Sequence, residues 1–598
     1  MTTVTQSPGH AAETHHDHHE LSFVQKYIFS KDHKIIGMQF LFVGLLMFLV
    51  GGFLALCVRW QLAWPADLPG GALLEAIGLA NAVAKEGGRV VYQMGGETYT
   101  MLFTMHASIM IFLVIIPLLT GAFGNFLIPL QIGARDMAFP TLNMASFWVF
   151  MLGVGIVVAS FFYGGAAAGW TSYPALAGTK YSPQFGQTLW CMGVFTLGWS
   201  SILGSINYIT TFVKMRAPGM HFFRMPLTSW ALFITSILVL FGTPVLGSAL
   251  FMLTIDRLYD ANFFTPATGG QPLLWQHLFW FYSHPAVYIM ILPAMGMVSD
   301  IMACFCRKPI FGYKPMIYSI GGIAFLGFLV WGHHMFMSGM NPYLGMTFMI
   351  STTMIALPSA VKVFNWLATM WNSDMHLTVP MLNSLAFVSM FIIGGLSGIF
   401  MSSTPVDIQI HDTYFIVGHI HYVLFGGTMF GIFGAIQFWF PKMFGRLMNV
   451  TIGKIHFWIS FVAFNCTFFP MHILGMAAHP RRIGVGYDYV NGTAGGGYEF
   501  LQDVQWMNVF MTVSAAVLGC AQLLLMANFI WSIFKGKPAS ANPWRATTLE
   551  WCATPVVPGH GNFGPKLPTV YRGAFEYSSP LVEEDFLPQN RKLETETT

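Results

Sequence analysis

Six histidines fall inside long apolar stretches of the chain: His106, His284, His333, His334, His419 and His421. Inside a membrane an imidazole is costly, and it usually lines a cavity, a ligand or an ion path. A single such histidine is more often a hydrogen-bonded core residue, yet neutral imidazole is also a common ligand of redox metals and haem. Six of them together favour a metal centre over simple packing.

The spacing of two histidine pairs limits what they can bind. His419 and His421 are two residues apart, about 200° around a helix, so they face opposite flanks and can each hold a different cofactor. His333 and His334 are about 100° apart and can converge on one metal if another helix supplies a further ligand.

His284 is a suitable further ligand, and a tyrosine accompanies it. Pro285 follows it and removes a backbone N–H, which loosens the helix there. Tyr288 lies one turn beyond His284 on the same helix face. Three imidazoles suit copper, and well-separated axial positions suit haem irons.

Three other polar features are ambiguous by themselves. Lys362 lies in the middle of an apolar stretch, where a lysine is a functional candidate unless its amine extends to the membrane surface. The pair Arg481 and Arg482 would ordinarily flank the bilayer, and Asp136, in a polar loop, would ordinarily be solvated.

The composition identifies the kind of protein that positions these residues. Of 598 residues, 55% are hydrophobic, 16% aromatic and only 9% charged, whereas soluble proteins carry about 25% charged residues. This excludes an ordinary soluble enzyme and a disordered chain. The net charge of +3, spread along the chain, makes nucleic acid an unsuitable partner. Seven cysteines without paired CxxC spacing argue against a disulfide framework or a zinc ribbon.

The apolar runs predict an all-α integral membrane protein with twelve transmembrane helices. A bilayer core needs roughly 20 apolar residues per helix. Runs of this kind lie near 35–60, 99–130, 141–163, 188–213, 227–254, 274–303, 312–337, 343–371, 380–403, 412–440, 451–474 and 504–534. Lys and Arg are concentrated in alternate loops, which predicts that both termini are cytoplasmic.

The regions outside these helices are short. We expect a cytoplasmic N-terminal tail at 1–34, a twelve-helix catalytic domain at 35–534 with an extramembrane loop near 61–98, and a cytoplasmic Pro-rich tail at 535–598. The polar start of the chain shows no cleavable signal peptide. Its histidines are expected to be solvated rather than metal-bound. They are His10, His15, His16, His18 and His19.

Four motifs now identify a family. The strings WFYSHPAVYIMILP, WGHHMF, PSAVKVFNW and HDTYFIVGHIHYVLFGG resemble subunit I of the haem–copper oxygen reductases, of the aa3-type cytochrome c oxidase branch. The likeness runs from DHKIIG near residue 32 to PRR at 480–482. It implies twelve helices in three pseudo-symmetric arcs, in a bacterial-type inner membrane.

The resemblance implies a role for each candidate ligand. His106 and His421 would be the axial ligands of a low-spin haem, His419 the ligand of a high-spin haem, and His284, His333 and His334 the ligands of one copper ion. Tyr288 would be joined covalently to His284 and would supply an electron and a proton. The haems are expected to be haem a and haem a3. Arg481 and Arg482 would hold haem propionates, and Arg59 would contact a haem formyl group. His411 and Asp412 would form part of a magnesium site at the interface with subunit II.

Two proton paths are also implied. One would run through Lys362, with Ser359 one turn away, toward Tyr288. The other would begin at Asp136 and continue past the polar groups of neighbouring helices: Asn125, Asn143, Asn207, Ser200 and Ser201.

The second path departs from the common family pattern at its inner end. Many members carry a glutamate directly after the His–Pro pair, where this chain has Ala286. The preceding Tyr282 and Ser283 match the subgroup that lacks the glutamate. We expect their hydroxyls to orient waters in its place, so that proton pumping persists.

The function implied is that of a terminal oxidase. It would reduce O2 to water with electrons from cytochrome c, or from a cytochrome-bearing donor complex, and pump protons across the lipid membrane. The expected partners are a subunit II with a dinuclear copper site and a subunit III. A quinol oxidase is the nearest alternative, and a nitric oxide reductase fits Tyr288 and Lys362 less well. A transporter or a passive haem carrier would leave the histidine set unexplained.

Overall fold

The computed structural model describes residues 22–84, 89–484 and 498–593 of the chain. The five N-terminal histidines lie outside these residues. Within the described part, helices dominate, and eleven helical segments are long and apolar enough to cross a membrane. This agrees with eleven of the twelve predicted runs.

Seven of the eleven segments contain one long helix each. They are α1 (His33–Ala63), α5 (Pro140–Ser160), α6 (Phe185–Lys214), α7 (Leu227–Tyr259), α8 (Pro272–Phe305), α12 (Val379–Ser402) and α16 (Val450–Met476). An eighth joins a short 3-10 turn, η10 (Glu499–Val504), to α17 (Gln505–Lys535). Polar caps set several starts: Asp32 accepts from the Lys34 amide at α1, and Asn449 accepts from the Ile452 amide at α16.

Three segments are divided into shorter pieces, and two of them change helix type along their length. The first runs through α3 (Gly96–Ser108), π-helical η2 (Ile109–Ile115) and η3 (Pro117–Gly124), and α4 (Asn125–Ile132); the second comprises α10 (Pro342–Met354) and α11 (Ala356–Met370); the third comprises α14 (Tyr414–His421), π-helical η8 (Tyr422–Met429) and α15 (Phe430–Phe444). Short π-helical stretches in helices are frequent at functional sites.

The predicted helix near 312–337 is not a single helix. It consists of α9 (Tyr313–Gly327), too short to cross a membrane by itself, and a 3-10 turn, η7 (Trp331–Met335). The apolar run hides this break because hydropathy counts composition and not backbone shape. His333 and His334 therefore lie in a turn, and the helical angle of 100° between them does not apply.

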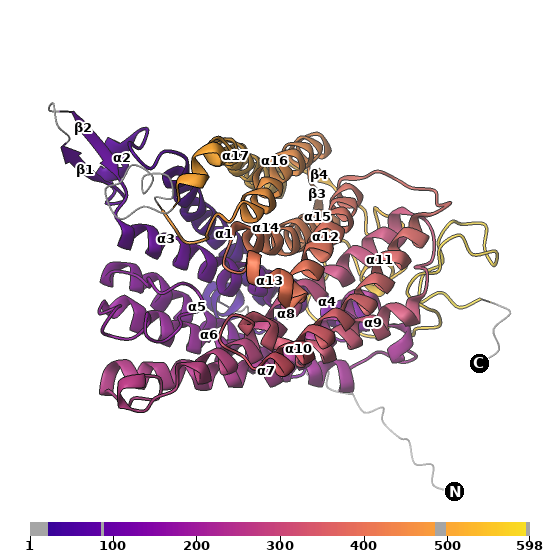
Figure 1. Ribbon diagram of the computed structural model, residues 1–598. Coiled ribbons are helices and arrows are strands. Elements are labelled where there is room, and N and C mark those ends of the chain that lie inside the picture. The colour runs from indigo at the N-terminus through magenta and orange to yellow at the C-terminus, as the bar shows by residue number, and fades with distance from the viewer. Residues whose placement is uncertain (1–21, 85–88, 485–497, 594–598) are drawn as a thin grey trace, which may run out of the picture.

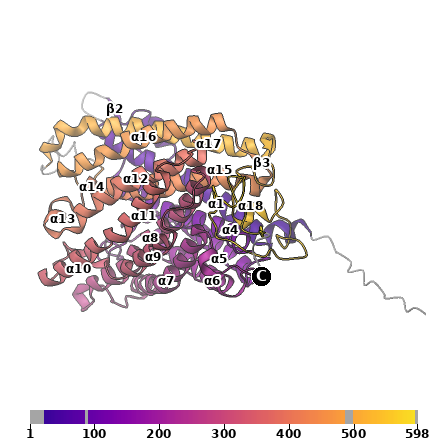
Figure 2. The ribbon, with the colours of Figure 1, turned by 90° about the vertical axis from the view of Figure 1, so that its right-hand side faces the viewer.

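Three spans form the interior of the bundle. The described residues of Gly96–Ile132, Pro272–Phe305 and Tyr414–Phe444 are far more buried than those of the other eight spans. Figures 1 and 2 show α8 and α15 surrounded by the other helices. These inner spans carry His106, His284, His419 and His421, so the costly imidazoles face protein and not lipid.

Short elements occupy the two ends of the bundle. At one end, α2 (Gly71–Ala76) packs beside the antiparallel pair β1 (Asn81–Ala84) and β2 (Val90–Gln93), within the predicted loop. The described chain begins and finishes at the opposite end (Figures 1 and 2). The remaining elements are connectors: η1 (Val24–Ile28), η4 (Phe161–Tyr163), η5 (Phe222–Arg224), η6 (Pro266–Thr268), α13 (Thr404–Ile410), β3 (Arg446–Leu447), β4 (Lys537–Pro538) and α18 (Leu549–Cys552).

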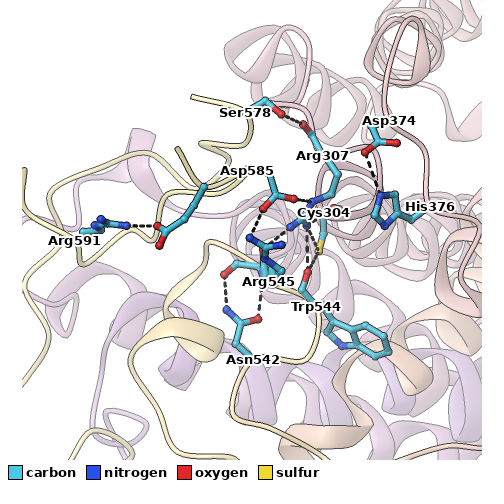
Figure 3. Close-up of polar contacts among 12 residues, drawn as sticks. Cys304, Arg307, Asp374, His376, Asn542, Trp544, Arg545, Ser578, Asp585 and Arg591 are labelled. Atoms are coloured by element: carbon cyan, nitrogen blue, oxygen red, sulfur yellow. Dashed lines mark hydrogen bonds and ion pairs between the residues drawn. The ribbon is translucent and has the colours of Figure 1, made fainter. Parts of the chain in front are cut away.

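The C-terminal tail packs against the ends of the helices. Leu549, Trp551 and Leu587 are buried there. Arg307, just after α8, donates to Asp585 at 2.8 Å and to the Trp544 carbonyl at 3.1 Å (Figure 3). The Pro-rich sequence of this segment does not reveal these contacts, because its apolar residues follow no helical or strand period.

Candidate metal centre

Three imidazoles converge between α8 and η7. Nδ1 of His284 lies 3.1 Å from Nε2 of His334, and one ring nitrogen from each of His284, His333 and His334 lies within 4.8 Å of the others. Nε2 of His284 is buried and has no hydrogen-bond partner among the described residues. A buried nitrogen without a partner is costly, so this trio fits a metal ion bound by three nitrogens.

Neighbouring side chains hold the trio in place. Nδ1 of His333 lies 3.1 Å from the Thr352 hydroxyl on α10. The Trp280 indole stacks on His334 with ring centroids 3.7 Å apart. The Tyr288 ring packs edge-on against His284 with centroids 4.9 Å apart. Such outer contacts fix ring orientation at metal sites.

His106 and His421 form a parallel pair. Their ring planes differ by only 4°, and their centroids are 6.4 Å apart. Nδ1 of each donates to a backbone carbonyl, that of Gly51 at 2.8 Å for His106 and that of Val417 at 2.7 Å for His421. Each Nε2 is thereby left for another partner, and the spacing leaves room for a metal with two bonds of about 2 Å.

His419 faces the opposite flank of α14, as the i, i+2 spacing predicts. Its Nδ1 lies 2.9 Å from both the Gly394 carbonyl and the Ser397 hydroxyl of α12. Its Nε2 is therefore left for another partner, on the flank of α14 opposite His421.

Arginine side chains lie near the end of the bundle that carries β1 and β2, and Arg59 is the first of them. Arg59 donates to the Asn508 carbonyl at 3.0 Å, but its Nε and Nη1 are buried and have no hydrogen-bond partner among the described residues. They fit a polar group that the described residues do not supply.

Arg481 and the neighbouring acidic loop form an ion-pair cluster. Arg481 Nε lies 2.6 Å from Asp412 Oδ1. His411 Nδ1 lies 3.0 Å from Asp407. Burial raises the pKa of Asp412, but the Arg481 charge outweighs this and holds the pKa below its ordinary value. Asp412 and Arg482 adopt left-handed backbone conformations (φ 56° and 68°), which non-glycine residues keep only where the surroundings enforce them.

A cavity with both apolar and polar lining residues lies inside the bundle and reaches Tyr282. Its volume is about 60 Å³, enough for a few waters. The polar residues that line it include Thr120, Asn125, Ser146, Ser200, Ser201, Ser205, Tyr208, Ser236 and Tyr282. Ser283 is buried, and its hydroxyl has no hydrogen-bond partner among the described residues.

Asp136 lies in the loop between α4 and α5, at the tail end of the bundle. It is half-buried, and burial raises its pKa. The charge of His33 acts in the opposite direction but does not cancel the effect of burial. Asn207 secures the loop: its Oδ1 accepts from the Phe139 amide at 2.9 Å. Asn143 is buried, and neither end of its amide has a hydrogen-bond partner among the described residues.

Lys362 is fully buried on α11. Its Nζ has no hydrogen-bond partner among the described residues and lies 5.3 Å from the centroid of the Trp366 ring. The Ser359 hydroxyl does not contact it but donates to the Ile355 carbonyl at 2.9 Å. A buried lone amine has no structural benefit.

Sequence reasoning missed the side chains that orient the ligands. Trp280 lies four residues before His284, a spacing that could have identified it. Thr352 and Ser397 carry no such signal, because they lie on separate elements and only the fold brings them to their histidines.

Comparison with known proteins gives a consistent picture. The sequence profile described as "Cytochrome C and Quinol oxidase polypeptide I" matches residues 35–517. The chain is 43% identical over 582 residues to "Cytochrome c oxidase subunit 1" of Synechocystis sp., covering 97% of each chain. It is 40% identical over 591 residues to "Alternative cytochrome c oxidase subunit 1" of Bradyrhizobium diazoefficiens, covering 96% of this chain and 94% of that one.

A solved structure shares the fold at low sequence identity. One chain of a haem–copper terminal oxidase dimer superimposes with a TM-score of 0.67 at 17% identity, covering 85% of both chains.

Proposed function

Because this chain belongs to the cytochrome c and quinol oxidase polypeptide I family, we propose that it is the catalytic subunit of a terminal respiratory oxidase. The enzyme reduces O2 to water with electrons from cytochrome c and couples this to proton movement across the membrane. Its relatives are named cytochrome c oxidase subunit 1, so a quinol oxidase is not favoured. The observation that carries the proposal is the histidine trio beside two further histidine positions.

The trio is the proposed copper site. His284, His333 and His334 present three nitrogens within 4.8 Å of one another, which suits copper. When bound, the copper and a facing haem iron supply electrons to oxygen. Trp280 and Thr352 keep the imidazoles in orientation, so the ligand set is prepared before the metal binds.

Two haem positions are proposed, for haem a and haem a3. The parallel rings of His106 and His421 support axial ligation of a low-spin haem. His419, on the other flank of α14, would ligate a high-spin haem facing the trio. Arg481 and Arg482 are the proposed partners of haem propionates, and the unpaired N–H groups of Arg59 would donate to a formyl oxygen.

Tyr288 is proposed to act beside the metals. Its phenol lies on the same face of α8 as His284, with ring centroids 4.9 Å apart. It would supply one electron and one proton when the O–O bond breaks. A covalent His284–Tyr288 bond is part of this proposal, and a peptide mass without such an adduct would contradict that part.

Two proton routes are proposed. Lys362, with Ser359 nearby on α11, would deliver protons toward Tyr288. Asp136 would admit protons to the cavity past Asn143 and Asn207. That cavity joins Asn125, Ser200 and Ser201 to Tyr282. Tyr282 and Ser283 would take the place of the absent carboxyl at Ala286.

The remaining assembly is also a proposal. His411 and Asp412 would provide two ligands of a magnesium ion, completed by subunit II with its dinuclear copper. A subunit III and a cytochrome-bearing donor complex are further expected partners. The chain is a multi-pass membrane protein. We place it in a bacterial inner membrane, with twelve crossings in three arcs and both termini cytoplasmic.

Oxygen uptake by the purified complex tests the function. We expect uptake with reduced cytochrome c and none with a quinol. His334→Asn should abolish oxygen uptake and bound copper but preserve the low-spin haem spectrum. His376→Asn, at an exposed position, should leave oxygen uptake, bound copper and the haem spectrum unchanged. Oxygen uptake with a quinol but not with cytochrome c would contradict cytochrome c as the electron donor. Full activity of His334→Asn would contradict the copper assignment.

A further inference from the structure

Two buried carboxyl groups lie close together at the tail end of the bundle, apart from the metal site. Asp300 of α8 is 6% exposed and Glu550 of α18 is 1% exposed. Gln131 of α4 joins them: its Nε2 donates to Asp300 Oδ2 at 3.4 Å and to Glu550 Oε1 at 3.1 Å. We call Asp300 and Glu550 the carboxyl pair.

The orientation of the bridging amide is fixed. Ser229 of α7 donates to Gln131 Oε1 at 2.7 Å, so the amide NH2 must face the two carboxyls. Asp300 Oδ1 also accepts from the Leu227 amide at 3.1 Å, and Glu550 Oε1 accepts from Trp439 Nε1 at 3.3 Å. Glu550 Oε2, by contrast, is buried and has no hydrogen-bond partner among the described residues.

Within the part of the chain that the structure describes, no cation forms an ion pair with either carboxyl. Lys442 of α15 is near enough to act on Glu550, but its Nζ donates to the Thr554 hydroxyl at 3.1 Å and the Pro555 carbonyl at 2.9 Å instead. The thiols of Cys304 and Cys552 and the phenol of Tyr313 also face the pair, and thiols and phenols are ordinarily uncharged at neutral pH.

Two buried carboxylates without a contacting cation cannot both stay ionised, because their desolvation and mutual repulsion add. Burial raises the pKa of Glu550. Gln131 donates one N–H to each partner, so either carboxyl can carry the single negative charge that remains. Such a pair titrates as a unit.

The carboxyl pair adjoins the surroundings of Lys362. Ser299 directly precedes Asp300 in α8, and its hydroxyl accepts from Trp366 Nε1 at 2.9 Å. Lys362 Nζ lies 5.3 Å from the Trp366 ring and has no hydrogen-bond partner among the described residues. The buried amine and the pair therefore flank the same contact between α8 and α11.

We propose that Asp300 and Glu550 share one proton, take up a second from the aqueous phase at the tail end, and pass it to the amine of Lys362. The charge of the pair changes from −1 to 0 when it takes up a proton from the aqueous phase. It returns to −1 when that proton moves to the amine of Lys362. The C-terminal tail, through Glu550, thereby contributes one of the two carboxyl groups of a proton-transfer site. This rests on the proposed role of Lys362.

Glu550→Gln and Asp300→Asn test the proposal, singly and together. A glutamine at 550 still accepts from Gln131 and Trp439 through its carbonyl, so the tail should stay docked. We expect a protonated-carboxyl stretch in the infrared spectrum of the wild-type complex at neutral pH, shifted in D2O and lost in the double variant. Absence of this band in the wild type, or its persistence in the double variant, would overturn the shared proton.

Turnover tests the transfer step. Oxygen uptake should fall severalfold in Glu550→Gln, with a changed pH profile and an unchanged haem spectrum and Tm. Glu550→Asp, which keeps a carboxyl, should restore the profile, and the exposed tail variant Glu584→Gln should match the wild type. An unchanged profile in Glu550→Gln would overturn the transfer. If the wild type showed no uptake at all, the oxidase proposal would fail, while the infrared result would still decide the shared proton.

Discussion

Thr352 shows how a single hydroxyl can prepare a metal site. It lies 3.1 Å from Nδ1 of His333 and thereby leaves Nε2 for the metal. Loss of such an outer contact lowers metal affinity by about 10–100-fold.

Thr352→Val should therefore weaken copper binding by about tenfold or more, with the haem content unchanged. Copper per haem, measured after dialysis against a graded chelator, checks this. Thr347→Val is the matched control, because Thr347 is exposed on the same helix and its hydroxyl donates to the Tyr343 carbonyl of that helix. Equal copper affinity in the two variants would contradict the role of Thr352.

Lys362 has an amine that the fold does not need. Its Nζ is fully buried and has no hydrogen-bond partner among the described residues, and burying an unpaired ammonium is unfavourable. Lys362→Met should leave the Tm unchanged or higher, while oxygen uptake falls by about 100-fold or more, as for a lost proton donor.

Oxygen uptake and thermal unfolding of the same preparation check this. Lys180→Met, at an exposed loop position, should alter neither. A lower Tm with full activity in Lys362→Met would show that the amine is structural.

At the scale of elements, the turn η7 decides whether the trio can form. A β-carbon at Gly332 would lie 2.3 Å from the Phe348 ring of α10, whereas one at Gly345 would meet nothing within 4 Å. Gly332→Ala should displace the turn, reduce bound copper and destabilise the protein by about 1–3 kcal/mol.

Gly345→Ala, inside α10, should be neutral or stabilising by up to about 1 kcal/mol. Metal analysis and thermal unfolding of both variants check this pair. Normal copper content in Gly332→Ala would mean that the turn tolerates the shift without loss of the ligand set.

The tail is a second element whose docking depends on charge. Burial acts to raise the pKa of Asp585, but its hydrogen bond and charge contact with Arg307 outweigh this and lower it. A lowered pKa stabilises docking above the ordinary value of about 4, and this contribution is lost as the pH falls through the lowered pKa. Because Asp585 is partly exposed, it contributes about 1 kcal/mol or less.

Proteolysis of the tail should therefore accelerate below about pH 4 in the wild type. In Asp585→Asn the tail should already be cleaved faster than in the wild type at neutral pH, and the cleavage rate should change less as the pH is lowered. Glu584→Gln, which removes a surface pair with Arg591, is the control. Identical acid sensitivity in wild type and Asp585→Asn would show that the contact between Arg307 and Asp585 in Figure 3 does not hold the tail in place.

At the scale of the whole molecule, the cavity that reaches Tyr282 is the proposed inner part of the route from Asp136. Ser201 lines it, so Ser201→Leu should fill part of the space and exclude water. We expect slower oxygen uptake and a lower ratio of protons moved to electrons transferred, with unchanged haem spectra.

Measurement of acidification by reconstituted vesicles checks this, with Ser248→Leu on the exposed face of α7 as the control. Undiminished proton movement in Ser201→Leu would place the route elsewhere. In the same assay, Tyr282→Phe with Ser283→Ala tests the replacement of the missing carboxyl, and a retained ratio would contradict it.

The sequence by itself determined the membrane class, the helical runs and the ligand types. These follow from local properties: apolar length, the period of the helix, and the cost of an imidazole among apolar residues. The i, i+2 spacing of His419 and His421 placed them on opposite flanks, and the structure agrees.

Only the tertiary structure decided the contacts between distant segments. The parallel rings of His106 and His421 and the bridge from Gln131 to Glu550 each join residues far apart in the chain. Packing of one element against another fixes such contacts, and packing leaves no periodic signal in the sequence. The tail was therefore predicted as a polar extension, although it covers the helix ends and brings a buried carboxyl to them.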